Sequence, residues 1–140
     1  MQTATIRWQL GEQFEAATPS GHNLHLDSER NSNTGPGPME LLLVALGACT
    51  ATDVVLILEK KRQKLESLEV AVSGERAAAP PQVWTRLEVV FRVRGRGAEG
   101  GPLEEKAVAD AVRLSEEKYC SVAAMLCQTA QLTMRYEIFS

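Results

Sequence analysis

Apolar and polar residues alternate one by one in several parts of the chain, which is the pattern of a strand with one buried face. The alternating stretches are residues 3–10, Leu68–Val72, Val83–Arg94 and 132–138. Turn residues at Gly11 and at 18–21 separate two shorter apolar runs, so we expect further strands at 13–17 and His22–Leu26. The first three strands are close enough in sequence to form an antiparallel meander, with residues 3–10 as a half-buried strand.

The stretch Gly35–Lys61 has a different pattern and predicts a long helix. Nearly every residue from Met39 to Leu58 is apolar, on all sides of the helix, and Pro38 suits its first turn. A helix that is apolar all round lies inside a protein or in a membrane. Thr50, Thr52 and Asp53 would be costly in lipid. We therefore expect the central helix of a soluble domain, wrapped by other elements.

The remaining elements complete an α+β fold. The long strand Val83–Arg94 should point its alternate residues Thr85, Leu87, Val89, Phe91 and Val93 inward. Its opposite face should be exposed to solvent. Pro102 should open a second helix that runs to Leu114, and a short apolar segment follows at Val122–Cys127. The order βββ-α-ββ-αα-β indicates helices packed against antiparallel sheet. Without a linker or an internal repeat, residues 1–140 are expected to form a single domain.

Charge and cysteine content narrow the function classes. The net charge is −3 and the sequence pI is near 5.5, which argues against nucleic acid or a membrane as the main partner. The first residues alternate like a strand and lack the cationic, apolar pattern of an export signal, so we expect a cytoplasmic protein. Its three cysteines should then start out reduced.

Cys49 lies within the apolar helix and has two interpretations. As a small hydrophobic residue it would only fill the core. As a reactive thiolate it would need a cationic or hydrogen-bonding neighbour, because burial alone makes a thiol inert. Asp53 is one turn further on and would oppose ionisation if it faced the sulfur.

Cys120 stands between two helical segments, in the sequence KYCSV. A helix N-terminus and the nearby Lys118 would favour its thiolate, whereas a buried turn cysteine would be inert. If Cys49 and Cys120 meet in space, they could cycle between dithiol and disulfide. Cys127 is interpreted as a core residue.

Two segments together resemble one known family. GPGPMELLLVALGACTATDVVLIL and, 71 residues past Cys49, SEEKYCSV are similar to the cysteine segments of the OsmC/Ohr family of thiol-dependent peroxidases, most of all to its YhfA-like branch. The resemblance covers essentially the whole chain. It implies an OsmC-like fold and a homodimer of two intertwined chains, with sheet outside and the cysteine helices packed centrally.

The resemblance also implies an activity. Cys49 corresponds to the peroxidatic cysteine, which attacks an organic hydroperoxide or hydrogen peroxide and becomes a sulfenic acid. Cys120 corresponds to the resolving cysteine, and the resulting disulfide is reduced by an external dithiol. This chemistry needs no metal and no bound organic cofactor. The expected role is that of an antioxidant enzyme in the oxidative stress response.

The helix start departs from the pattern of the peroxidases that it resembles. They carry N-P-E-[EQ] there, with an arginine held against the cysteine by the first glutamate. Here Met39 follows Pro38 and the acidic residue is Glu40, about 100° further round the helix. Arg30 lies near the position of the arginine in one branch, although exposed loops commonly carry charge and a solvated loop cation is the favoured interpretation. The competing hypothesis is a non-enzymatic, redox-responsive or apolar-ligand-binding protein.

Overall fold

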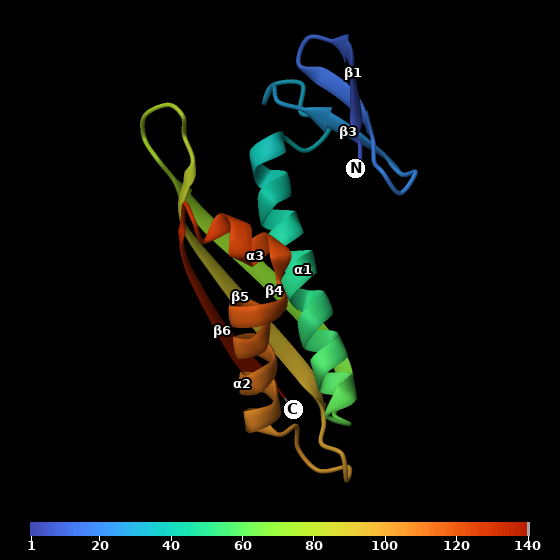
Figure 1. Ribbon diagram of the computed structural model, residues 1–140, viewed down its shortest axis with the longest axis vertical. Coiled ribbons are helices and arrows are strands. Elements are labelled where there is room, and N and C mark those ends of the chain that lie inside the picture. Colours follow the sequence, from blue (N-terminus) through green and yellow to red (C-terminus); the bar gives the residue numbers. More distant parts are fainter. Residues whose placement is uncertain (140) are drawn as a thin grey trace. The chain divides into compact units, whose positions relative to one another are not determined.

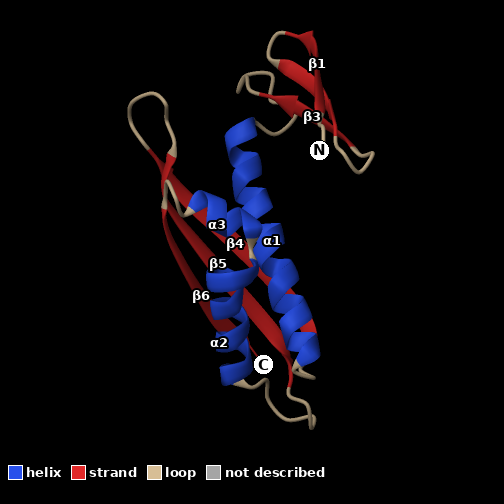
Figure 2. Ribbon diagram, in the orientation of Figure 1, coloured by secondary structure: helices blue, strands red, loops and turns tan. Residues whose placement is uncertain are grey.

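The computed structural model describes residues 1–139, which fold as two compact units (Figures 1 and 2). The first unit is Met1–Leu42 and the second begins at Leu43, within the long helix α1. The elements are β1 Thr5–Leu10, β2 Gln13–Ala17, β3 Asn23–Asp27, α1 Pro38–Lys60, β4 Lys64–Arg76, β5 Trp84–Arg96, α2 Glu105–Leu114, the π-helical turn η1 Ser115–Tyr119, α3 Ser121–Leu126 and β6 Gln131–Phe139. The α+β class is confirmed. The single domain over 1–140 stays a prediction.

The first unit contains the predicted meander. Strands β1, β2 and β3 pair antiparallel in that order, with Trp8 opposite Phe14. The prediction that β1 is half-buried is wrong, because all six of its residues are exposed. Alternation reports which side chains share a face of a strand. It does not report whether another layer covers that face.

A buried carboxylate holds the loop that follows β3. Asp27 is 4% exposed, and its Oδ2 accepts hydrogen bonds from Ser32 Oγ at 2.6 Å and from the backbone N–H of Thr34 at 3.0 Å. These hydrogen bonds, that of Ser32 first, hold the pKa of Asp27 well below its usual range. The polar segment between β3 and α1 therefore has a fixed conformation although it lacks regular secondary structure.

The second unit is built on a mixed sheet of β4, β5 and β6. Strands β4 and β5 form an antiparallel hairpin in which Val70 faces Phe91. Strand β6 pairs with β5 in parallel, with Tyr136 beside Phe91. The expectation of a purely antiparallel sheet is therefore wrong. The helical segments between β5 and β6 form a crossover that returns the chain to the same end of the sheet.

Strand β5 supplies the centre of the core. The side chains of Leu87, Val89, Phe91 and Val93 are completely buried, as the alternation predicted. Thr85 is exposed, contrary to the prediction, and its hydroxyl donates a hydrogen bond to the Glu75 carbonyl.

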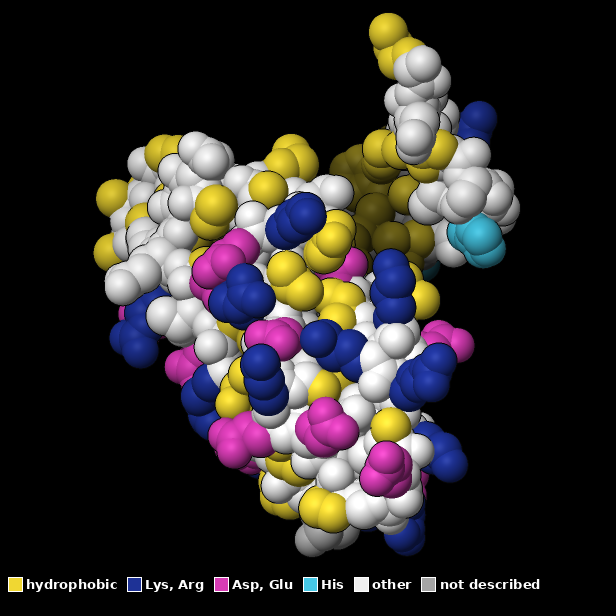
Figure 3. Space-filling view, turned by 60° about the horizontal axis from the view of Figure 1, so that its bottom comes forward, with side chains coloured by type: hydrophobic (Ala, Val, Ile, Leu, Met, Phe, Trp, Pro, Cys, Tyr) yellow, Lys and Arg dark blue, Asp and Glu magenta, His cyan; other side chains and the backbone are white. Residues whose placement is uncertain are grey.

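The opposite face of this sheet is polar, as expected. Its ion pairs include Arg92 with Glu137 and Arg135 with Glu88, all on exposed or half-exposed side chains. Side chains of both charge signs are interspersed over the surface in Figure 3. Exposed ion pairs of this kind add little stability, so we interpret this face as a solvated one.

Helix α1 begins at Pro38 as predicted but is covered on one face only. Its five buried residues are spaced about one turn apart, and they are Leu46, Gly47, Thr50, Val54 and Leu58. Val44 and Leu56 are 63% and 56% exposed. Within the described chain, the helix is therefore not wrapped on all sides, although both the sheet and the segment that carries Cys120 contact it.

By length and composition alone, α1 is the one helix among residues 1–139 that could cross a membrane. The core helix of a soluble protein meets the same criteria. Its buried residues Leu46, Val54 and Leu58 belong to the same core as β5, and a Cβ at Gly47 would lie 3.2 Å from Val72. This close packing on a sheet favours the soluble interpretation.

The second helical region differs from the prediction at its start. Helix α2 begins at Glu105 rather than at Pro102. Pro102 instead forms an isolated bridge with Arg96, and the N–H of Glu104 donates to the side chain of Gln63. The π-helical turn η1, which the periodicity did not predict, follows α2 directly and leads to Cys120.

Candidate functional site

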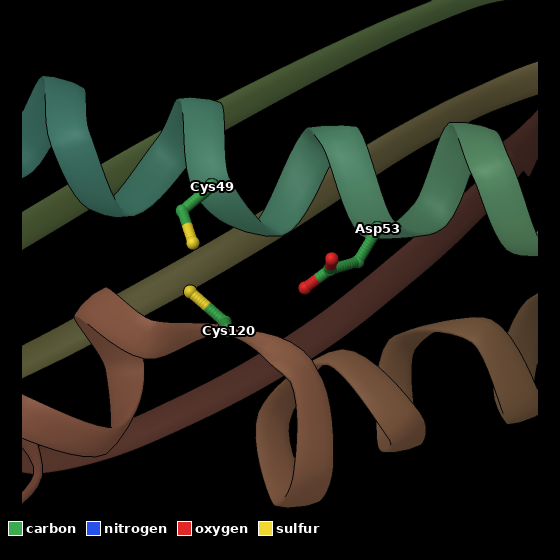
Figure 4. A group of neighbouring side chains, drawn as sticks. All are labelled: Cys49, Asp53 and Cys120. Carbon is green, nitrogen blue, oxygen red and sulfur yellow. The ribbon is translucent and has the colours of Figure 1, made fainter.

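Two thiols and one carboxylate converge in the second unit (Figure 4). Cys49 and Asp53 lie one turn apart on α1, so they share a face of the helix. Cys120 faces them from the junction of η1 and α3. The two sulfur atoms and a carboxylate oxygen of Asp53 all lie within 4.8 Å of one another. The structure thus brings together the two cysteines that are far apart in sequence.

Backbone hydrogen bonds fix the position of Cys120. Its own N–H donates to the carbonyl of Ser115 at 2.9 Å, which closes the π-helical turn η1. Its Sγ accepts a hydrogen bond from the backbone N–H of Ala123 at 3.2 Å and caps α3. The residue is 3% exposed, whereas Cys49 is partly exposed. Cys49 is therefore the more accessible of the two thiols.

The side chain of Asp53 is held in place by a hydrogen bond from the buried Ser115. The hydroxyl of Ser115, which is fully buried, donates a 2.8 Å hydrogen bond to Asp53 Oδ2. This bond joins α1 directly to the turn that carries Cys120. The spacing of four residues from Cys49 pointed to Asp53. No sequence signal pointed to Ser115, which is 62 residues further along the chain.

Burial dominates the electrostatics of Cys120. It raises the pKa of this thiol from its ordinary 9.0 to about 11, and the side chain of Cys49 adds to the shift. The hydrogen bond from Ala123 acts in the opposite direction but is the smaller effect. Of the two interpretations of Cys120, the structure favours the buried turn cysteine, because burial outweighs the effect of the helix start. The ammonium of Lys118 lies over the Tyr119 ring instead, 5.3 Å from its centre.

The charge beside the thiols is negative. Asp53 faces them, as Figure 4 shows, and among residues 1–139 no Lys or Arg forms an ion pair with it. Reactive thiolates are usually found beside positive charge. This carboxylate therefore does not supply the activation that a peroxidatic cysteine requires.

The other two predicted site residues belong to the first unit. Arg30 is exposed in the loop after β3. Glu40 is also exposed, and its Oε1 accepts a 2.9 Å hydrogen bond from the N–H of Gly37, which caps the first turn of α1. Over the described chain, no ion pair joins Arg30 to Glu40.

Cys127 lies outside the group of thiols and carboxylate. It is exposed, and its thiol donates to the carbonyl of Ala124 at 3.3 Å, so the prediction of a core residue is wrong. Helix α3 ends at Leu126, and Cys120 only caps it, so the seven-residue spacing does not keep both cysteines on one buried face. Cys127 therefore offers a matched control for experiments on the other two thiols.

Comparisons with known proteins agree on one family. The sequence profile of the family described as OsmC-like protein matches residues 31–135. Protein YhfA of Escherichia coli K12 is 41% identical over 135 residues, which are 96% of each chain. A hypothetical protein from Aquifex aeolicus VF5 is 30% identical, with a TM-score of 0.81 over 100% of this chain and 98% of that one. The organic hydroperoxide resistance protein OhrB of Bacillus subtilis is 14% identical, with a TM-score of 0.63 over 98% of both chains, and so shares the fold.

The raised pKa of Cys120 predicts its reactivity. Alkylation follows the thiolate fraction, so the rate at Cys120 should keep rising until the pH passes about 11. In the urea-unfolded chain the same curve should level off near 9.0. At pH 8 the shift corresponds to about 100-fold less thiolate in the folded protein. Peptide mass spectrometry after pulses of iodoacetamide measures both curves, and identical curves for the folded and unfolded chain would contradict the assignment.

Proposed function

Because the chain belongs to the OsmC-like protein family, we propose that it is a thiol-dependent peroxidase that reduces organic hydroperoxides or hydrogen peroxide. The predicted family is confirmed, and the family fold is shared with organic hydroperoxide resistance proteins. The observation that carries the proposal is the approach of the Cys49 and Cys120 sulfurs to within 4.8 Å. We place the activity in the cytoplasm, where thiols are kept reduced.

In the proposed reaction Cys49 acts first. Its thiolate attacks one peroxide oxygen, the O–O bond breaks, and the alkoxide takes up a proton and leaves as an alcohol. The sulfenic acid of Cys49 then condenses with the thiol of Cys120, which forms the disulfide and releases water. An external dithiol returns the pair to its reduced state. The two thiols together lose two electrons, and the peroxide gains them.

The different environments of the two thiols support this order. Cys120 is buried and has a raised pKa, so it is protonated near neutral pH and is a poor first nucleophile. Cys49 is the more exposed thiol and is the one that a peroxide can approach. Catalytic contributions of Arg30 and Glu40 stay predictions.

Variants of the cysteines test the reaction. We expect the reduced protein to consume cumene hydroperoxide in the presence of dithiothreitol, and Cys49→Ser to lower the rate to that of buffer. Cys120→Ser should still form one sulfenic acid per chain, which dimedone traps at Cys49. A ferrous-xylenol orange assay follows the peroxide, and mass spectrometry identifies the adduct.

Cys127→Ser is the control for this experiment, because it removes an exposed thiol outside the group. It should leave peroxide consumption unchanged. Peroxide loss that survives in Cys49→Ser but disappears in Cys127→Ser would show that the wrong cysteine has been assigned.

One observation favours a second function, that of a redox-responsive protein without turnover. The carboxylate of Asp53 lies within 4.8 Å of the thiols, and among residues 1–139 no Lys or Arg forms an ion pair with it. A thiol pair of this kind can still be oxidised slowly to a disulfide. Peroxide consumption that stops after one equivalent per chain, with dithiol present in excess, would favour this function over the peroxidase.

We also propose that the protein is a homodimer, in which a second copy covers apolar side chains that this chain leaves in water. On β1 the side chains of Ile6, Trp8 and Leu10 are exposed, and Ile6 and Trp8 lie two residues apart on one face of the regularly paired part of the strand. On α1 the side chains of Val44 and Leu56 are more than half exposed. Within each unit, large apolar side chains left in water favour association, because burying them against a partner removes apolar surface from solvent.

Charge placed on the exposed side of α1 should weaken the dimer. Losing the burial of one leucine and adding a charge costs about 2–3 kcal/mol, or about 30- to 150-fold in the dissociation constant. We therefore expect Leu56→Glu to shift the dimer towards monomer in sedimentation equilibrium. Glu59→Gln alters an exposed residue on the same helix and should have little effect. A wild-type protein that is monomeric at millimolar concentration would refute the dimer.

A further inference from the structure

We propose that Cys49, Asp53 and Cys120 form a zinc-binding site. Their two sulfurs and one carboxylate oxygen are the donor types that zinc accepts, and they come from two segments of the fold that face each other (Figure 4). Magnesium and calcium prefer sites made only of oxygen, and Cu(I) prefers sulfur alone. The mixed set of two thiols and a carboxylate therefore favours Zn²⁺, with water as the fourth ligand.

The spacing of the three groups fits a tetrahedral ion. With Zn–S distances of about 2.3 Å, the two sulfurs of such a site lie about 3.8 Å apart. The three donor atoms already lie within 4.8 Å of one another. Small rotations of the side chains would thus complete the geometry, without movement of α1 or of the turn before α3.

Two of the three proposed ligands, Asp53 and Cys120, also accept hydrogen bonds from neighbouring groups that would orient them. Ser115 Oγ donates to Asp53 Oδ2, which orients the carboxylate and leaves its other oxygen for the ion. The N–H of Ala123 donates to the Cys120 sulfur and would support its thiolate form. The partial exposure of Cys49 and Asp53 provides a route for the ion to enter.

The local charge favours a cation. The carboxylate faces two thiols, and no Lys or Arg pairs with it within residues 1–139. On binding, Zn²⁺ replaces the two thiol protons, which are released to solvent, and three anionic ligands surround the ion. A peroxidase mechanism gives the carboxylate of Asp53 no role. In a metal site the same carboxylate is a ligand.

Zinc binding is independent of the proposed peroxidase activity, but the two would compete for the same sulfurs. A peroxide that oxidises the zinc-bound thiolates removes two electrons, forms the Cys49–Cys120 disulfide and, with two protons, yields an alcohol, water and free Zn²⁺. The disulfide lacks thiolate ligands and cannot retain the ion. The site would then couple metal release to oxidation.

A zinc competition titration on the reduced, chelator-stripped full chain tests the site without peroxide. We expect one Zn²⁺ per chain against a chromophoric chelator, and thiolate-to-cobalt charge-transfer bands with Co²⁺. Cys49→Ser, Cys120→Ser and Asp53→Asn should each weaken binding at least 10-fold. Ser115→Ala should weaken it about 10- to 100-fold, as the loss of an outer contact does. Cys127→Ser and Glu59→Gln should bind as the wild type does.

Oxidation provides a further test in which Cys49, Asp53 and Cys120 all stay unaltered, so it does not depend on the folding of a variant at the site. In the Cys127→Ser background, diamide should join Cys49 to Cys120 and abolish zinc binding, and reduction should restore it. Absence of zinc binding by the reduced wild type would overturn the proposal. So would binding that Asp53→Asn and Cys120→Ser leave unchanged, or zinc that stays bound after the disulfide has formed. Circular dichroism confirms that each variant retains its fold.

Discussion

The partly buried hydrogen bond between Ser115 and Asp53 fixes the geometry on which the site depends. It joins helix α1 to the π-helical turn at a separation of 62 residues, with a donor–acceptor distance of 2.8 Å. The hydroxyl of Ser115 is fully buried and would cost about 1–3 kcal/mol without a partner, so its bond to Asp53 stabilises one relative position of helix and turn. In that position Cys120 lies opposite Cys49. The polar pair thus determines which two sulfurs of the chain meet.

The same geometry would serve both proposed kinds of chemistry, which exclude each other. Sulfurs within 4.8 Å can form a disulfide after a small movement, and they can equally share a metal ion with Asp53. Burial favours the neutral thiol at Cys120, so either process must first remove its proton. An oxidised neighbour at Cys49 or an incoming cation would each promote that loss. Competition between oxidant and metal for these protonated groups would decide the state of the site.

The parts of the fold that depend on local pattern could be predicted from the sequence. Strand alternation placed Leu87, Val89 and Phe91 in the core, and the apolar stretch after Pro38 identified α1. The resemblance to a family paired Cys49 with Cys120, which local patterns cannot do. The parallel pairing of β6, the π-helical turn and the contact of Ser115 with Asp53 depend on how distant segments pack. No spacing along the chain encodes these contacts.

Helix α1 shows what an all-round apolar pattern means in a chain of this size. The pattern favours burial on every side, yet among the described residues Val44 and Leu56 are left exposed. Complete burial of a side chain of this size is worth about 1.5–3 kcal/mol, of which these two, 63% and 56% exposed, forgo more than half. Selection for stability of a lone chain would place polar residues there. Their apolar character fits the proposed homodimer, in which a second copy would cover them, and the sequence of α1 would then describe the environment of the helix in that assembly rather than in one chain.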